Sequence, residues 1–270
     1  MIMAIAKKNE GEVIAFDRNS VLEEFAGEGL EEVTAEDLAI PFLRVLAQLS
    51  PQVNKRDGAY VDGAEAGMIY NTVANEAYDG EKGILVVPCH YNRKFIEWQP
   101  RSSGGGFVSS HPIDSNLLKE TTKSDRGEDV LPNGNVLTNT AQFFVVFVEG
   151  EQLHKCCITM SSTQLKKARR WVALQAGFKG KKRDGSTFTQ PSFSQMYRLK
   201  TAAESNDKGD WFGWDISHER ALDLSAEGGE LSLLHECRDF KIAVADGRVE
   251  TKDSAESSSA ESPEEDEVPF

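Results

Sequence analysis

The chain has 270 residues and a mass of 29.8 kDa, and 39% of its residues are hydrophobic, so it can bury a sizeable core in one large domain with appendages. No apolar run approaches the roughly 18 to 20 residues that span a membrane, and the opening MIMAIAKKNEGE lacks the long apolar region of a secretory signal. We therefore expect a globular protein of the cytoplasm, including a host cytoplasm, with no membrane partner.

The formal net charge of −14 is distributed unevenly. Residues 1–40 carry 3 basic and 10 acidic side chains and residues 250–270 carry 1 basic and 8 acidic, so each end has a net charge of −7. By contrast, residues 152–203 contain 11 Lys or Arg against Asp184 alone, a local net charge of +10. This segregation predicts a surface that attracts polyanions and acidic ends that can compete for it.

Three parts follow from composition: an acidic N-terminal arm at residues 1–33, a core at residues 34–245, and a disordered acidic tail at residues 246–270. The core opens with TAEDLAIPFLRVLAQLSPQV. Its apolar spacing predicts a helix that starts at Thr34, bends or restarts at Pro41 and ends before Pro51.

Residues 66–217 have the alternating pattern of strands joined by hairpins. The predicted strands are GMIYNTV, GILVVPCHYNRKFIEWQP, TAQFFVVFVEG, QLHKCCITMS, FSQMYRLKTAAES and DWFGWDIS. Residues 109–135 and the basic GFKGKKRDGS are predicted to be loops.

One helix is predicted among these strands, in STQLKKARRWVALQAG, with a cap at Ser161 or Ser162. Its expected apolar stripe is Leu165, Ala168, Val172 and Ala176, which leaves its cations on the other side.

The order of strands, one helix and two more strands is that of an OB-fold. We therefore predict a mainly β (α+β) protein built on an OB-like Greek-key barrel with an N-terminal helical extension. The same periodicity of hydrophobic residues also fits another small barrel or an α+β sandwich.

A binder of unpaired nucleic acid needs cations along the phosphates and flat rings on which bases stack. The predicted strands and the basic segment offer both kinds of side chain. Burial in the core is the competing interpretation for each ring, and an ordinary solvated face is the competing interpretation for the helix cations. The candidate single-stranded-DNA-binding residues are Tyr91, Arg93, Lys94, Phe95, Trp98, Lys166, Lys167, Arg169, Arg170, Lys179, Lys181, Lys182, Arg183, Tyr197, Arg198, Lys200, Trp211 and Trp214.

Nothing in the sequence predicts catalysis. It contains no phosphate loop, no nucleophile elbow and no carboxylate signature of a nuclease. Cys89, Cys156, Cys157 and Cys237 include no C-x-x-C, and neighbouring Cys156 and Cys157 cannot both face one side of a strand. His-Cys neighbours could ligate zinc, but buried strand cysteines explain them as well. We expect no enzyme activity, no cofactor and no metal.

The tail carries a more specific signal. It closes with Glu264, Glu265, Asp266, Glu267, Val268, Pro269 and Phe270. This ending resembles the acidic C-terminal tip of bacterial single-stranded-DNA-binding proteins and the Phe-terminated tails of phage replication single-stranded-DNA-binding proteins. The body, in IPFLRVLAQLSPQV and GILVVPCHYNRKFIEW, is also similar to phage proteins of that class.

The resemblance implies a partner-binding tail that recruits a polymerase, primase, helicase or recombination enzyme, with the Phe ring in an apolar pocket and the acids steering its approach. The function expected is therefore a non-enzymatic protein that coats single-stranded DNA in phage replication or recombination; its oligomeric state, including a homo-oligomer, stays open. The alternatives are a single-strand annealing or mediator protein, and a virion or anti-defence protein that mimics DNA with its acidic ends.

Overall fold

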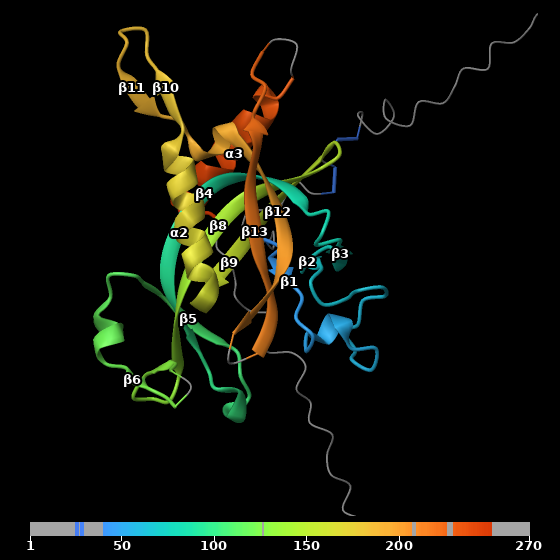
Figure 1. Ribbon diagram of the computed structural model, residues 1–270, viewed down its shortest axis with the longest axis vertical. Helices are drawn as coiled ribbons and strands as arrows, with labels where there is room; N and C mark the ends of the chain where they lie inside the picture. The colour runs from blue at the N-terminus through green and yellow to red at the C-terminus, as the bar shows by residue number, and fades with distance from the viewer. Residues whose placement is uncertain are drawn as a thin grey trace, which may run out of the picture. The chain divides into compact units, whose positions relative to one another are not determined.

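The computed structural model describes residues 25, 26, 28, 29, 40–125, 127–206, 209–225 and 229–249, and every helix and strand described lies in one unit, residues 39–270 (Figure 1). Most of the predicted arm, the first residues of the predicted N-terminal helix and the tail beyond Val249 lie outside the described residues. None of the helices described is long and apolar enough to cross a membrane.

The main sheet is antiparallel, with strand order β13-β12-β4-β8-β7-β6; β5 pairs with β4 and β9 pairs with β8. Its central strands, β4 (Ile84–Trp98) and β8 (Val136–Glu149), pair along almost their whole length. They contain 15 and 14 residues, beyond the usual 3 to 10, and such long strands twist strongly. The other strands are β5 (Phe107–Pro112), β6 (Thr122–Lys123), β7 (Asp129–Val130), β9 (Gln152–Ser161), β12 (Gln195–Asn206) and β13 (Gly209–Ala221).

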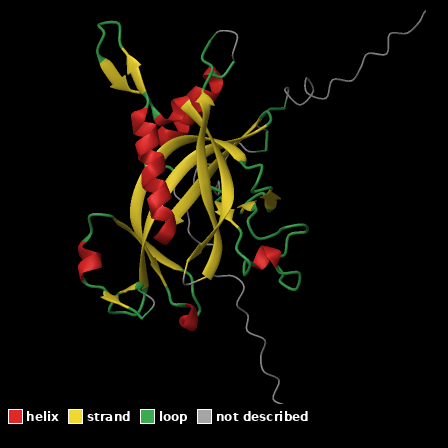
Figure 2. Ribbon diagram, in the orientation of Figure 1, coloured by secondary structure: helices red, strands yellow, loops and turns green. Residues whose placement is uncertain are grey.

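The sheet curls into a half-barrel that does not close (Figure 2). Strand β12 pairs with β4 over three residues only, Tyr197 to Leu199, and then continues as a two-stranded ribbon with β13. Among the described pairings, β13 has no partner other than β12. The predicted closed OB-like barrel is therefore wrong, whereas the mainly β class is confirmed. The predicted order of strands, one helix and two strands is correct only in part, because another hairpin lies between the helix and β12.

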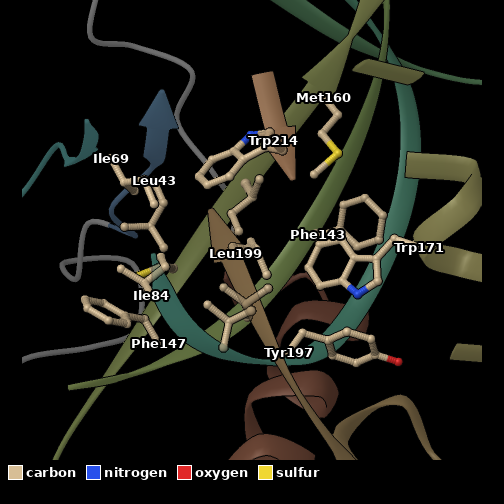
Figure 3. Close-up of a cluster of buried hydrophobic side chains, with 14 of the residues drawn as sticks. Leu43, Ile69, Ile84, Phe143, Phe147, Met160, Trp171, Tyr197, Leu199 and Trp214 are labelled. Atoms are coloured by element: carbon tan, nitrogen blue, oxygen red, sulfur yellow. The ribbon is translucent and has the colours of Figure 1, made fainter. Parts of the chain in front are cut away.

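Two helices cover the two faces of the sheet. α2 (Leu165–Gly177) packs Ala168 and Trp171 into a cluster with Phe143, and α3 (Leu231–Ala245) packs Phe240 into a second cluster with Phe144 (Figure 3 shows the first). Because neighbouring strand residues face opposite ways, both faces of β8 are buried. The same alternation puts Cys156 in the first cluster and Cys157 in the second, which confirms that they do not share a side.

The N-terminal end of the described core is extended, not helical. Residues predicted as helix form β1 (Leu43–Val45), in a small sheet of order β1-β2-β3 with β2 (Ile69–Asn71) and β3 (Glu76–Tyr78). Pro41 cannot donate within a helix, and its carbonyl accepts from the amide of Cys157 at 2.8 Å. Tertiary pairing therefore overrides the apolar spacing, and the following Pro51–Val53 forms the short helix η1.

Three other segments differ from expectation. The predicted loop at 109–135 contains the end of β5, the short helix η3 (Asn116–Lys119), β6 and β7. The predicted basic loop is a hairpin of β10 (Lys179–Lys181) and β11 (Thr187–Thr189), and α3 was not predicted at all. The remaining short helices are η2 (Arg101–Ser103), η4 (Ser162–Gln164) and η5 (Ser192–Ser194).

Candidate nucleic-acid interface

The side of α2 that faces away from the sheet is basic, because the apolar residues of the helix pack on the side that faces the sheet. Ala168 and Trp171 are buried, and Lys166, Arg169 and Arg170 are exposed on the other side. The predicted stripe is correct at Leu165, Ala168 and Val172, which pack on the core cluster. It is wrong at Ala176, which is exposed, and it omits Trp171. No side-chain hydrogen bond caps η4 or α2, so the predicted serine cap is also wrong.

The β10–β11 hairpin continues this basic face. It follows α2 after Phe178 alone and extends beyond the C-terminal end of the helix (Figure 1). Asp184 holds the turn by accepting bonds from the amide and hydroxyl of Ser186, at 2.9 and 2.6 Å. The exposed cations of helix and hairpin together form the surface that we call the basic ridge: Lys166, Arg169, Arg170, Lys179, Lys181, Lys182 and Arg183.

The basic ridge is not neutralised by the described part of the chain. Other cations of the same segment are paired: Lys155 with Glu236 at 2.6 Å, Arg198 with Glu219 at 2.9 Å, and Lys167 with Glu204. No described acidic residue forms a salt bridge with a ridge cation. The positive charge expected from the sequence is therefore reduced at the paired positions and concentrated on the ridge.

A polar network joins the start of α2 to the β12–β13 ribbon. Glu204 accepts hydrogen bonds from the indole of Trp211 at 2.8 Å and from Gln164 at 3.3 Å, and pairs with Lys167. Burial raises the pKa of Glu204, but the bonds from Lys167 and Trp211 outweigh it, so its pKa is lowered and the carboxylate stays charged. Trp211 is thereby held, half-buried, next to the helix.

Three of the rings expected to stack on bases are in the core. Phe95 and Trp214 are 3% exposed and Tyr197 is 0% exposed. Burial raises the pKa of Tyr197 to about 12. These rings lie on faces of the sheet that are covered by other parts of the chain, so they do not reach solvent. They are therefore not surface stacking residues.

The candidates on β4 lie apart from the ridge. Tyr91 is half-buried against Phe143, with ring centroids 4.9 Å apart, and Trp98 meets Phe107 edge-on at 6.1 Å. Arg93 donates from Nε to Asn139 at 2.7 Å, and Lys94 is half-buried. The Trp98 end of β4 lies with β5, at the end of the sheet away from the hairpin (Figure 1). Lys200 is half-buried on β12 and is not part of the ridge.

One exposed ring was missed by sequence reasoning. Phe188 on β11 is 40% exposed and lies over Gly180, where an added Cβ would be 2.5 Å from the ring. It alternates with Thr187 and Thr189 and sits among the hairpin cations. The Thr-Phe-Thr alternation could have identified β11 and this ring.

A comparison with protein-family models assigns residues 11–248 to the family described as Pam3 phage gp34-like protein. The chain belongs to this phage protein family. No curated protein and no solved structure matches it significantly. The expected phage origin is thus supported at the level of family, and the family description names no activity.

Within this phage protein, the described residues contain no group of three or more His, Cys, Asp or Glu that could hold a metal ion. All four cysteines are buried free thiols, and burial raises the pKa of Cys156 to about 12. The partner-binding tail expected at Glu264 to Phe270 lies outside the described residues.

Proposed function

We propose that this phage protein binds single-stranded DNA during replication or recombination and that the basic ridge contacts the phosphates. The observation that carries the proposal is the run of exposed, unneutralised cations along one helix and the hairpin that extends it. The 13 residues of α2 alone span about 20 Å, enough to follow several phosphates.

The site differs from that of a typical OB-fold. An OB-fold binds a strand on an exposed sheet face, but here α2 and α3 cover both faces. The ridge and the two rings that accompany it, Phe188 on the hairpin and Trp211 beside the helix, replace the sheet face in the proposal. A flat ring among cations favours an unpaired strand over a duplex, whose bases are already stacked.

The acidic tail completes the proposal. Residues 250–270 have a net charge of −7 and are covalently attached, so they compete with DNA for the ridge at low ionic strength. When DNA displaces the tail, its Val268, Pro269 and Phe270 become available to a replication or recombination enzyme, as the resemblance to single-stranded-DNA-binding tails implies.

Fluorescence anisotropy with a labelled oligo-dT and with a duplex of equal length, across a salt series, tests the proposal. We expect preference for the single strand and a log-log salt slope of about −0.7 per phosphate contacted. The double variant Lys181→Glu with Lys182→Glu should bind at least tenfold more weakly. The double variant Lys55→Glu with Arg56→Glu is a control with the same charge change at exposed residues outside the ridge.

Two results would redirect the proposal. If neither nucleic acid binds, even with the tail removed, the DNA-mimic or virion alternative is favoured. If the single strand binds and complementary strands are also paired by the protein, the annealing alternative is favoured.

A further inference from the structure

We propose that the bound strand crosses the β10–β11 hairpin on one face, where Phe188 and His218 each stack on an unpaired base. This inference rests on the proposed function and adds base contacts to the phosphate contacts of the basic ridge. It follows from the register of the hairpin, from the support beneath Phe188 and from a row of rings that joins the hairpin to β13.

The register gives the two faces of the hairpin different side chains. Gly180 pairs with Phe188, and the pairs on either side of it each join a lysine to a threonine. Those pairs are Lys179 with Thr189 and Lys181 with Thr187. Since successive residues of a strand point to opposite sides, Phe188 lies on one face, which we call the ring face, and the lysine–threonine pairs lie on the other. A base that stacks on this hairpin must therefore approach its ring face.

Phe188 is supported from below by the backbone of β10. A Cβ added at Gly180 would lie 2.5 Å from two atoms of the Phe188 ring, so the ring can occupy this position only because residue 180 has no side chain. Phe188 is nevertheless 40% exposed, and the exposed area is on the side away from Gly180. One side of the ring is thus held and the other is open, as a stacked base requires.

A row of rings continues the ring face toward β13. Phe178 precedes Gly180 by two residues, and its carbonyl accepts from the amide of Gln190 at 2.9 Å, so it extends the pairing of the hairpin on the same side as Phe188. The half-buried Phe178 ring lies against the imidazole of the exposed His218, with centroids 4.7 Å apart and planes inclined by 38°. The ring face therefore has an accessible ring on each side of Phe178.

The imidazole of His218 is held in place by buried residues. Its Nε2 lies 2.9 Å from Oε1 of Gln195, and its ring meets that of Tyr197 edge-on at 5.6 Å. Gln195 is 3% exposed and Tyr197 is 0% exposed, so both contacts come from the core. Histidine is among the side chains on which unpaired bases stack, and an imidazole that is already positioned loses little freedom when a base binds.

The charges beside the ring face suit a strand that carries its phosphates with it. Lys182 follows Gly180 by two residues, its amide still pairs across the hairpin, and its exposed side chain is on the same side as Phe188. On β13, Glu219 accepts two hydrogen bonds from Arg198, each of 2.9 Å, so its negative charge is compensated. A nucleotide whose base stacks on Phe188 therefore brings its phosphate to a cation.

The test compares two labelled oligonucleotides of equal length and charge, one of deoxythymidines and one in which every nucleotide is abasic. The full-length protein should bind the base-bearing strand about tenfold or more tightly, the scale of one stacked base. Phe188→Leu removes the flat ring but keeps an apolar side chain. It should reduce this preference by at least about threefold and leave affinity for the abasic strand unchanged, and His218→Leu should act in the same way.

Each variant has a matched control on the opposite face of its strand. Thr187→Val next to Phe188 and Ser217→Ala next to His218 should both bind like the wild type. Gly180→Ala tests the support of the ring without removing it, because the added Cβ displaces Phe188 from its position over β10 and should also reduce the preference. Thermal unfolding checks that the variants fold.

The outcomes separate this inference from the proposed function. Equal binding of both strands by the wild type, or a preference that Phe188→Leu and His218→Leu leave unchanged, overturns the ring face and leaves the basic ridge intact. An equal loss of affinity for both strands in Phe188→Leu would mean that the ring supports the hairpin and does not stack on a base. Absence of binding to either strand overturns the proposed function and the ring face with it.

A second measurement needs no variant. Ultraviolet cross-linking of the wild type to a strand that contains one 5-iodouracil should attach the strand to Phe188 or His218. Cross-links confined to Trp98 or Trp211 would place the bases elsewhere and overturn the inference.

Discussion

The rings of Trp171 on α2 and Phe143 on β8 are stacked, with centroids 4.3 Å apart and planes inclined by 27°. The stack attaches the helix that carries the basic ridge to the centre of the sheet. The helix and its cations are thus positioned by two fully buried rings, since both residues are 0% exposed.

Trp171→Ala should therefore lower the free energy of unfolding by about 3 to 5 kcal/mol, the cost of truncating a buried Trp. Denaturant unfolding followed by circular dichroism measures this change. Leu174→Ala, on the same helix but 37% exposed, is the control and should cost much less. A loss below about 1 kcal/mol for Trp171→Ala would mean that the stack does not hold α2 in place.

Tyr197→Phe tests whether this ring belongs to the core or to the interface. The Tyr197 hydroxyl is buried and has no hydrogen-bond partner in the described structure, so its removal should leave stability unchanged or raise it by up to about 1 kcal/mol. Affinity for oligo-dT should not change, because the ring is inaccessible. Thermal unfolding and anisotropy are the two measurements, and a weaker complex with normal stability would return Tyr197 to the interface.

The sequence predicted those elements whose pattern is local. The β8–β9 hairpin and α2 could be predicted because the hydrophobic residues of each recur with a single clear periodicity. Polar residues mark the turn of the hairpin and the ends of the helix. In α3, Leu233, Cys237, Phe240 and Val244 have helical spacing and are buried, so this helix carries a local signal of its own. Helix α3 could have been predicted; the β1 strand could not, because its pairing with β2 is tertiary.

The binding face was harder to predict for a physical reason. Strand alternation separates two faces but does not say which is covered, and here both are. Rings such as Trp214 and Tyr197 therefore matched the pattern of a binding face while packing in the core. Except for Lys167, which is half-buried and paired with Glu204, the cations of α2 and the hairpin are exposed as predicted, because they lie outside the apolar stripe. The network around Glu204 joins it to Gln164, 40 residues away in the chain, which no local pattern shows.

Glu97 should make the stability of the β4–β5 end depend on pH. Its buried carboxylate accepts from Asn135 at 2.6 Å and from Asn133 at 3.1 Å, and meets Nε2 of His111 at 2.8 Å. The bond from Asn135 is the largest influence on its pKa, and with those from His111 and Asn133 it outweighs the effect of burial, so the pKa is lowered. Because this pKa is lower in the folded than in the unfolded state, the carboxylate stabilises the folded protein at pH values above its unfolded pKa of about 4.3. This stabilisation is lost as the pH falls through the folded pKa.

Glu97→Gln should accordingly reduce the free energy of unfolding by about 1 to 3 kcal/mol at pH 7. The difference from the wild type should shrink as pH falls below about 4.3, because the unfolded state then takes up a proton that the folded carboxylate binds only at lower pH. Urea unfolding at pH 7 and pH 3.5 measures both values. Glu120→Gln, an exposed carboxylate of the same region, should have little effect at either pH. A constant difference between the two pH values would mean that the charge of Glu97 contributes nothing.

The acidic tail should act as a salt-sensitive competitor. Deleting residues 250–270 removes a net charge of −7 that is tethered to the protein, so oligo-dT should bind more tightly at 50 mM salt. The gain should disappear near 1 M salt, where the Debye length is only about 3 Å. Replacing Glu264, Glu265 and Glu267 by Gln and Asp266 by Asn should reproduce part of the gain without shortening the chain. If the truncated protein binds more weakly at low salt, the tail contributes to the DNA site and the competition between tail and DNA is ruled out.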